Sequence, residues 1–142
     1  MKLPDVNLLL YAVDESSPRY DRAKPWLEDI LSGTEQIAFP WSVLLGFVRI
    51  STNPVAFAKA LDAKEALDLV DSWLAQPVAT IVNPSDRHAD ILRRLLEPVG
   101  AAGNLTTDAH LAAIAIEHGA ELLSSDADFT RFEGLRWRDP LR

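Results

Sequence analysis

The sequence contains no cysteine. This absence excludes disulfide bonds, thiolate metal sites and thiol nucleophiles, and it is typical of proteins of the reducing cytoplasm. The apolar run near the start, Val6 to Val13, is interrupted by Asn7 and closed by Asp14. It is too short for a secretory signal and far below the roughly 20 residues needed to cross a bilayer. We therefore expect a cytoplasmic protein without a membrane span.

Two other features of nucleotide- or nucleic-acid-binding proteins are missing. No glycine-rich phosphate loop of the form G-x-x-x-x-G-K or G-x-G-x-x-G occurs, which argues against the common nucleotide-binding folds. The net charge of −7 is the opposite of the basic surface expected of a nucleic-acid-binding protein. The end of the chain is locally positive, however, and carries Arg131, Arg136 and Arg138. Their guanidinium groups match phosphate geometry, although ordinary surface ion pairs and solubility are the simpler explanation.

The chain has 142 residues, of which 48% are hydrophobic and 25% charged, as is typical of one globular domain with a sizeable core. Residues 1–142 show no linker, repeat or low-complexity tract, so we predict a single domain. Short apolar segments alternate with helical patterns. The expected strands are a short one before Asp5, then 36–39, 78–82, 121–124 and 135–137, and the expected helices are 8–13, 16–32, 41–52, 62–75, 85–96 and 107–118.

This alternation predicts βαβ units, and therefore an α/β fold with a short-stranded, mainly parallel central sheet flanked by helices. Asn7 is the expected cap of the first helix. Trp26, Trp41 and Trp73 lie on apolar helix faces and are expected in the core.

Four aspartates follow the predicted strand ends or begin a helix beside them. Asp5 follows the first strand, and Asp126 and Asp128 follow the strand at 121–124. Asp108 lies in the first turn of an alanine-rich helix and joins them if that helix starts at the same sheet edge. In open α/β sheets this carboxyl edge is where ligands bind. Each aspartate also has a structural explanation: a turn at Asp5, the helix dipole at Asp108, and capping hydrogen bonds at Asp126 and Asp128.

Carboxylates without neighbouring histidine or cysteine favour Mg²⁺ or Mn²⁺ over zinc. The three histidines have no partner at metal-ligand spacing and are expected on the surface or on a helix face. Carboxylates that lie close together raise one another's pKa unless a cation compensates them. A divalent ion at such a site can polarise a phosphoryl oxygen and lower the pKa of a bound water, which suits phosphodiester hydrolysis.

Three stretches resemble a known family: PDVNLLLYA at the start, WSVLLGFVRISTNP in the middle and NLTTDAHLAAIAIEHGAELLSSDADFTRFEGLRWRDPL at the end. Together they are similar to the VapC-type PIN-domain ribonuclease toxins of VapBC toxin–antitoxin systems. The resemblance implies a PIN-like α/β sandwich and a Mg²⁺- or Mn²⁺-dependent endoribonuclease that cuts structured RNA such as tRNA or rRNA. It also implies a cytoplasmic homodimer, a cognate VapB-type antitoxin, and contact with DNA only through that antitoxin.

The resemblance further implies site residues. Asp5, Asp108 and Asp126 correspond to metal ligands, and Asp128 to a fourth acidic residue of the catalytic site, as ligand or support. One departure concerns the glutamate that these toxins commonly place on the helix after the second strand. Residues 36–61 contain no acid, and Gly46 stands about where that glutamate is expected. A catalytically degenerate PIN domain that binds RNA or protein is therefore the alternative hypothesis.

We predict that replacing Arg131, Arg136 and Arg138 together by alanine weakens RNA binding and flattens its dependence on salt, because fewer phosphates are neutralised. Metal binding should stay intact. Titration of labelled RNA at several salt concentrations measures the effect, and unchanged RNA affinity would refute the hypothesis.

Overall fold

A five-stranded, entirely parallel sheet forms the centre of the computed structural model, which covers residues 1–142. The strands lie in the order β3-β2-β1-β4-β5, so the first strand is at the centre. Each strand is short, as its sequence predicted. Their bounds are Lys2–Pro4 for β1, Ile37–Pro40 for β2, Ala79–Val82 for β3, Glu121–Leu123 for β4 and Trp137–Arg138 for β5.

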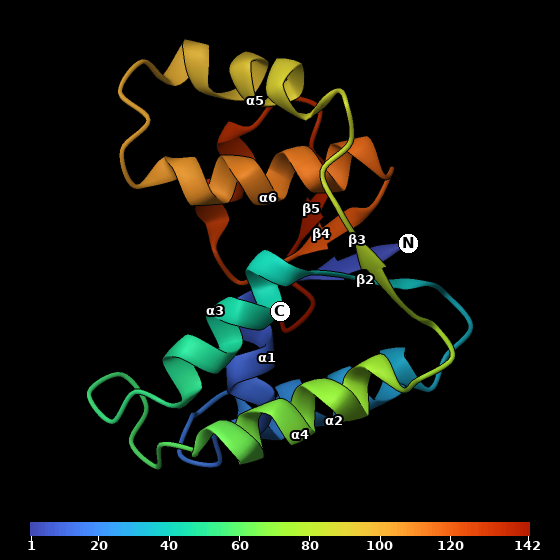
Figure 1. The fold of residues 1–142 in the computed structure, drawn as a ribbon, viewed down its shortest axis with the longest axis vertical. Coiled ribbons are helices and arrows are strands. Elements are labelled where there is room, and N and C mark those ends of the chain that lie inside the picture. The colour runs from blue at the N-terminus through green and yellow to red at the C-terminus, as the bar shows by residue number, and fades with distance from the viewer.

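Helices cover both faces of this sheet (Figure 1). Helices α5 and α6 lie together on one side, and α1 to α4 lie on the other. The predicted α/β fold with a parallel sheet is thereby confirmed. None of the helices combines the length and apolar character needed to span a bilayer. The helix bounds are Val6–Val13 for α1, Tyr20–Leu31 for α2, Trp41–Ser51 for α3, Ala63–Leu74 for α4, His88–Leu96 for α5 and Leu105–Glu117 for α6, with short 3₁₀ helices at Glu97–Val99 (η1) and Ala127–Arg131 (η2).

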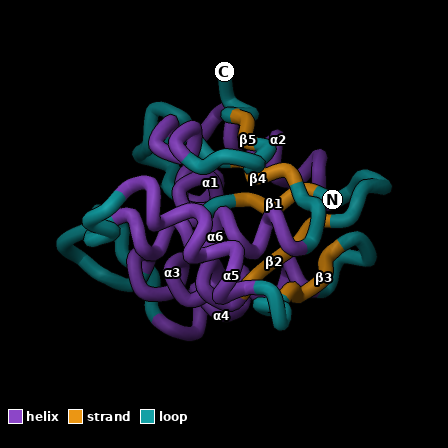
Figure 2. The backbone as a smooth tube through the Cα atoms, turned by 90° about the horizontal axis from the view of Figure 1, so that it is seen from above, coloured by secondary structure: helices purple, strands orange, loops and turns teal.

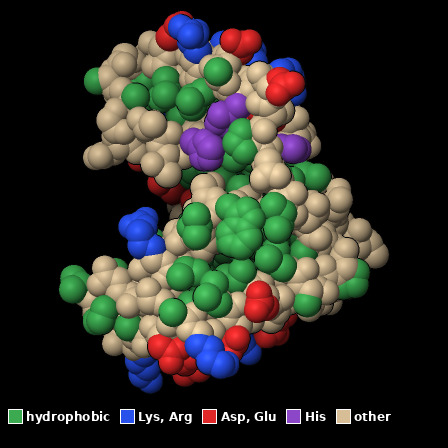
Figure 3. Space-filling model, viewed as in Figure 1, with side chains coloured by type: hydrophobic (Ala, Val, Ile, Leu, Met, Phe, Trp, Pro, Cys, Tyr) green, Lys and Arg blue, Asp and Glu red, His purple; other side chains and the backbone are tan.

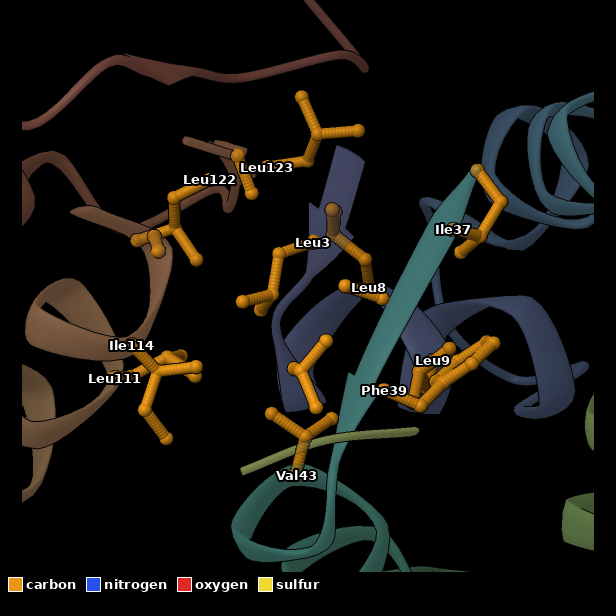
Figure 4. Close-up of a cluster of buried hydrophobic side chains, with 14 of the residues drawn as sticks. Leu3, Leu8, Leu9, Ile37, Phe39, Val43, Leu111, Ile114, Leu122 and Leu123 are labelled. Carbon is orange, nitrogen blue, oxygen red and sulfur yellow. The ribbon is translucent and has the colours of Figure 1, made fainter. Parts of the chain in front are cut away.

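The inner strands β1, β2 and β4 are largely buried because they are covered on both faces, which explains their nearly continuous apolar character. Leu3, Ile37 and Leu122 are fully buried and belong to one hydrophobic cluster of 31 residues. Figure 4 shows Leu3 between Leu8 of α1 and the side chains of Leu111 and Ile114 of α6. Burying each such side chain contributes about 1.5–3 kcal/mol. The core thus fixes the position of the strand ends, where the polar residues lie.

The first helix begins differently from the expectation. Asp5, not Asn7, is its cap: the Asp5 carboxylate accepts a hydrogen bond of 2.7 Å from the backbone N–H of Val6. Asp5 has extended backbone angles and follows β1 directly, so the helix starts as soon as the strand ends. The amide of Asn7 is then free for a contact with another element.

The expectation for Trp41 is also wrong. Its side chain is 44% exposed, whereas Trp73 is buried and stacks near Phe39. Trp41 follows the last residue of β2 and is the first residue of α3. It therefore lies at the carboxyl edge of the sheet, where nearly half of the residue's surface is accessible to solvent.

Candidate functional site

The carboxyl ends of β1 and β4 lie side by side at the centre of the sheet. Pro4 pairs with Leu123 in parallel register, and the backbone N–H of Asp5 donates to the Leu123 carbonyl at 2.9 Å. Asp5 and Ser124, the residues that follow these strands, are therefore neighbours although 119 positions separate them in sequence.

The Ser124 hydroxyl connects the polar residues at this edge. It donates to Asp5 Oδ2 at 2.7 Å, and it accepts from Asn7 Nδ2 and from the backbone N–H of Asp126, each at 3.1 Å. A serine hydroxyl has one donor and two acceptor positions, so all are used here. Ser124 is fully buried. It consequently holds the Asp5 carboxylate and the loop after β4 in one fixed arrangement.

Asp126 and Asp128 lie in that loop. Asp126 caps η2 and accepts a hydrogen bond of 2.9 Å from the backbone N–H of Asp128. The exposed carboxylate of Asp128 is 3.6 Å from Arg131. Buried Phe129 anchors the short helix against the core. The capping contact expected at Asp126 is thus present, and the same residue still belongs to the sheet edge.

Asp108 reaches the same place through the direction of α6. This helix ends at Glu117, and the chain turns at Gly119, with φ of 63°, into the start of β4. Since α6 leads into the amino end of β4, its own first turn lies toward the carboxyl edge of the sheet. Burial and, to a smaller extent, the negative charges of Asp126, Asp5 and Asp128 together raise the pKa of Asp108 to about 6.

The structure therefore brings the four predicted aspartates together. We call Asp5, Asp108, Asp126 and Asp128 the acidic cluster. The pKa of Asp5 is also raised, mainly by burial, although hydrogen bonds from Ser124 and Val6 counteract the effect. Figure 3 shows a hollow between the half of the molecule with α5 and α6 and the half with α3 and α4, with acidic side chains at its base. The negative charges of neighbouring carboxylates repel one another and raise their pKa values, and a bound cation would reduce this repulsion.

The donors of the cluster are all hard oxygen atoms, the kind that Mg²⁺ and Mn²⁺ prefer. Asn7 Oδ1 adds a buried oxygen without any hydrogen-bond partner, in the same side chain that donates to Ser124. No three acidic or histidine side chains already form a metal-binding arrangement. The oxygen donors of the cluster are thus chemically suited to such an ion.

Gly46 explains why no side chain from α3 joins the cluster. A methyl group on Gly46 would lie 2.9 Å from Val6 Cγ2, closer than carbon atoms pack without displacement. Val6 is the first residue of α1 and follows Asp5 directly. Helix α3 therefore packs against the start of α1 at the point where the resemblance placed a glutamate.

The three arginines near the end of the chain contact other parts of the same molecule. Arg131 pairs with Asp128, Arg138 donates to Glu121 Oε1 at 2.9 and 3.1 Å, and Arg136 donates to the Gly119 carbonyl. All three remain exposed. Their contacts are therefore intramolecular, and RNA binding by these three arginines stays a hypothesis.

The histidines form a contact that the sequence did not predict. His88 of α5 lies 2.7 Å from Glu117 Oε2 and 2.9 Å from His110 Nδ1, and both partners belong to α6. Burial lowers the pKa of His110, and the neighbouring His88 lowers it further. Burial alone would raise the pKa of Glu117, but hydrogen bonds from Ser85 and His88 outweigh it and lower the value. This network joins α5 to α6.

Comparison with known proteins agrees with this architecture. The family model described as PIN domain matches residues 2–135. Ribonuclease VapC37 of Mycobacterium tuberculosis is 49% identical over 99% of this chain and 97% of its own length. Ribonuclease VapC33 of the same organism is 44% identical over 100% of this chain and 99% of its own length. The chain therefore belongs to the PIN-domain family, in the branch of the VapC ribonucleases.

Solved structures of lower sequence identity share the fold. VapBC2 from Rickettsia felis, bound to a DNA fragment from its promoter, has a TM-score of 0.70 at 21% identity and covers 96% of each chain. VapBC-1 from nontypeable Haemophilus influenzae has a TM-score of 0.65 at 13% identity, with 97% of this chain and 96% of that chain covered. The sheet and its helices are thus preserved where little of the sequence is.

We predict that Asp108→Asn stabilises the protein at pH 7.5 in the absence of divalent ions. The folded pKa of Asp108 is raised to about 6, so its stabilising contribution is complete below the unfolded value near 3.9 and lost as the pH rises through 6. Removing the charge should raise the Tm at pH 7.5 by roughly 2–4 °C, since solvent screens part of the repulsion. The gain should fade toward pH 4. Thermal unfolding in EDTA measures it, with exposed Asp71→Asn as control, and an unchanged or lower Tm at pH 7.5 would contradict the prediction.

We also predict strong coupling between Gly46 and Val6. Gly46→Ala alone should destabilise the fold, because overpacking costs about 1–3 kcal/mol and exceeds the ~1 kcal/mol gain in helix propensity. In a Val6→Ala background the same substitution should stabilise by up to ~1 kcal/mol. Urea unfolding of the four proteins gives the coupling free energy, and additive effects would show that the two residues do not constrain each other.

Proposed function

We propose that the protein is the toxin of a type II toxin–antitoxin system and hydrolyses phosphodiester bonds in structured RNA, such as tRNA or rRNA, with Mg²⁺ or Mn²⁺. The observation that carries this proposal is the acidic cluster at the centre of the carboxyl edge. It is supported by the relatives named Ribonuclease VapC, which align with nearly the whole chain. The substrate RNA and the partner both belong to the cytoplasm, where the protein would act.

In this proposal Asp5, Asp108 and Asp126 hold the metal ion, and Asp128 supports the site from the neighbouring turn. Mg²⁺ retains several waters by preference, so the glutamate that is absent at Gly46 is not indispensable. When bound, the ion polarises a phosphoryl oxygen and lowers the pKa of a water. Ser124 keeps Asp5 oriented through its 2.7 Å hydrogen bond. Asp126 keeps its place because its backbone is bonded to the same hydroxyl.

A cognate VapB-type antitoxin is the proposed partner. The structural neighbours are VapBC complexes, and one of them is bound to promoter DNA. The net charge of −7 does not favour direct binding to DNA. We therefore propose that this protein contacts DNA only through its antitoxin, and that the toxin itself forms a homodimer.

The alternative function is a non-catalytic PIN domain that binds RNA or protein. Two observations favour it: the position of the expected glutamate is occupied by Gly46, and no three acidic or histidine side chains form a ready metal-binding arrangement. A domain of this kind would keep its fold and its partner and lack the ability to cleave.

The test is cleavage of total RNA by purified wild type, Asp5→Asn and Asp108→Asn, with Mg²⁺ or Mn²⁺ added. Both substitutions should reduce the cleavage rate at least ~100-fold, because each removes a charge from the ion's surroundings, whereas Asp71→Asn on exposed α4 should leave it unchanged. Growth upon induction should follow the same order. Toxicity and cleavage that survive both substitutions would rule out hydrolysis at the acidic cluster.

Metal binding provides a second measurement that does not need the substrate. An ion that binds only the folded protein raises its stability by about 2.7 kcal/mol at a concentration 100 times its Kd. Millimolar Mg²⁺ or Mn²⁺ should therefore raise the Tm of the wild type and not that of Asp5→Asn. A wild type without cleavage and without this shift would favour the non-catalytic alternative.

A further inference from the structure

A second polar cavity, of about 220 Å³, lies next to the acidic cluster. Its lining is positively charged, in contrast to the acidic cluster, because it contains three arginines and one aspartate. None of these residues belongs to the acidic cluster or to the arginines considered above. The cavity is lined by Arg19, Arg22, Ser125, Asp139, Leu141 and Arg142.

The guanidinium groups of this cavity are available for an external anion. Arg19 stacks on the ring of Tyr11, with 5.1 Å between the guanidinium carbon and the ring centre. Neither Arg19 nor Arg22 forms an ion pair within the chain, and Asp139 pairs only loosely with Arg142, at 3.9 Å. The formal charge of the lining is therefore +2 (three arginines less one aspartate). Arg131 and Arg138, by contrast, are paired with acidic residues of the chain.

Asp139 has a structural role that accounts for its presence. Its Oδ1 accepts a hydrogen bond of 2.9 Å from the backbone N–H of Leu141, and its side chain is only 9% exposed. The carboxylate thus holds the turn after β5 rather than neutralising Arg19 and Arg22. Leu141 is buried beside it and fixes that turn against the core.

The cavity and the acidic cluster share a wall. Ser125 lines the cavity, and its chain neighbours are Ser124, which is bonded to Asp5, and Asp126 of the cluster. Tyr11, on which Arg19 stacks, lies in α1, the helix that Asp5 caps. Figure 2 shows α2, β5 and the C-terminus at the same end of that view. The cavity joins the start of α2, the loop after β4 and the chain after β5. An anion bound by the arginines is therefore adjacent to whatever binds at the acidic cluster.

We propose that this cavity binds a backbone phosphate of the RNA, next to the phosphate that is cleaved. The identity of the polymer rests on the proposed function, whereas the anion site does not. Arginine forks bind phosphate oxygens with two parallel hydrogen bonds, and an unpaired guanidinium with a stacked face loses little freedom when it does so. A protein of net charge −7 needs such a local excess of positive charge to retain a polyanion. A carboxylate of an acidic protein segment is the competing occupant, but the shared wall with the acidic cluster favours the substrate.

The experiment compares wild type, Arg19→Gln/Arg22→Gln and a control with the same change in charge, Arg93→Gln/Arg94→Gln on α5. Binding of a fluorescein-labelled single-stranded RNA 16-mer of mixed sequence is followed by anisotropy at 50–200 mM salt, in EDTA so that metal-dependent cleavage does not occur. The cavity variant should bind about tenfold more weakly or worse at 50 mM salt. Its slope of log affinity against log salt should be shallower by roughly 0.7 for each lost phosphate contact.

The outcomes separate the possibilities. Equal affinity and slope in the cavity variant and the α5 control overturn the phosphate site. Poly-L-glutamate that displaces the RNA at equal charge concentration, and loses this ability in the cavity variant, overturns it in favour of a carboxylate site. If the double variant unfolds, Arg22→Gln alone is measured instead, since it leaves the Arg19–Tyr11 contact intact. This variant should also weaken RNA binding, with about half the change in the slope of log affinity against log salt. Reduced RNA binding in the cavity variant, combined with no cleavage by the wild type, would uphold the phosphate site and refute the proposed hydrolysis.

Discussion

The hydrogen bonds of the Ser124 hydroxyl are the interaction on which the site depends. β1 and β4 end at the same place because their backbones pair, but pairing alone fixes only the Cα positions. The hydroxyl connects the Asp5 carboxylate, the Asn7 amide and the Asp126 backbone across two chain segments that are distant in sequence. Because it is buried and uses every donor and acceptor position, any change of arrangement would leave a polar group unsatisfied, at a cost of about 1–3 kcal/mol. The site is therefore rigid at Asp5 and Asp126.

Around Ser124, the negative charges of the four aspartates repel one another. Asp108 and Asp5 both have raised pKa values, since burial and neighbouring carboxylates disfavour ionisation. A site selected only for stability would not collect four aspartates at one edge of a sheet, so the repulsion indicates a function that requires negative charge. A side chain at Gly46 would collide with Val6, so that position of α3 supplies no acid. The four acids come from the residue after β1, from α6 and from the loop after β4. Such a site has its lowest free energy with a cation present.

The sequence predicted the parts of this site that depend on local pattern and chain direction. Asp5 and Asp126 follow apolar strands, and the α/β alternation sends these strands in one direction, so their meeting could be inferred. Asp108 could be added because α6 must run back across the sheet to reach β4. The role of Ser124 could not be inferred, since its hydrogen bonds depend on side-chain distances between segments 117 and 119 positions apart. For the same reason the contact between His88 and His110 escaped prediction: the two residues lie on different helices, where spacing along the sequence carries no signal.

Under the proposed function, the distribution of charge explains how an acidic protein could bind a polyanionic substrate. The net charge of −7 is an average over a surface on which the two signs are separated by a short distance. At the carboxyl edge, Ser124 is bonded to the acidic cluster, and its neighbour Ser125 lines the arginine cavity. A phosphodiester backbone presents repeated negative charges, so under the proposed function adjacent phosphates would meet these two environments in turn, one through a cation and the next through guanidinium groups. Neither environment contacts a base in this arrangement. Selection among RNAs by these two sites would then depend on the path of the backbone, which suits folded RNA better than a particular linear sequence.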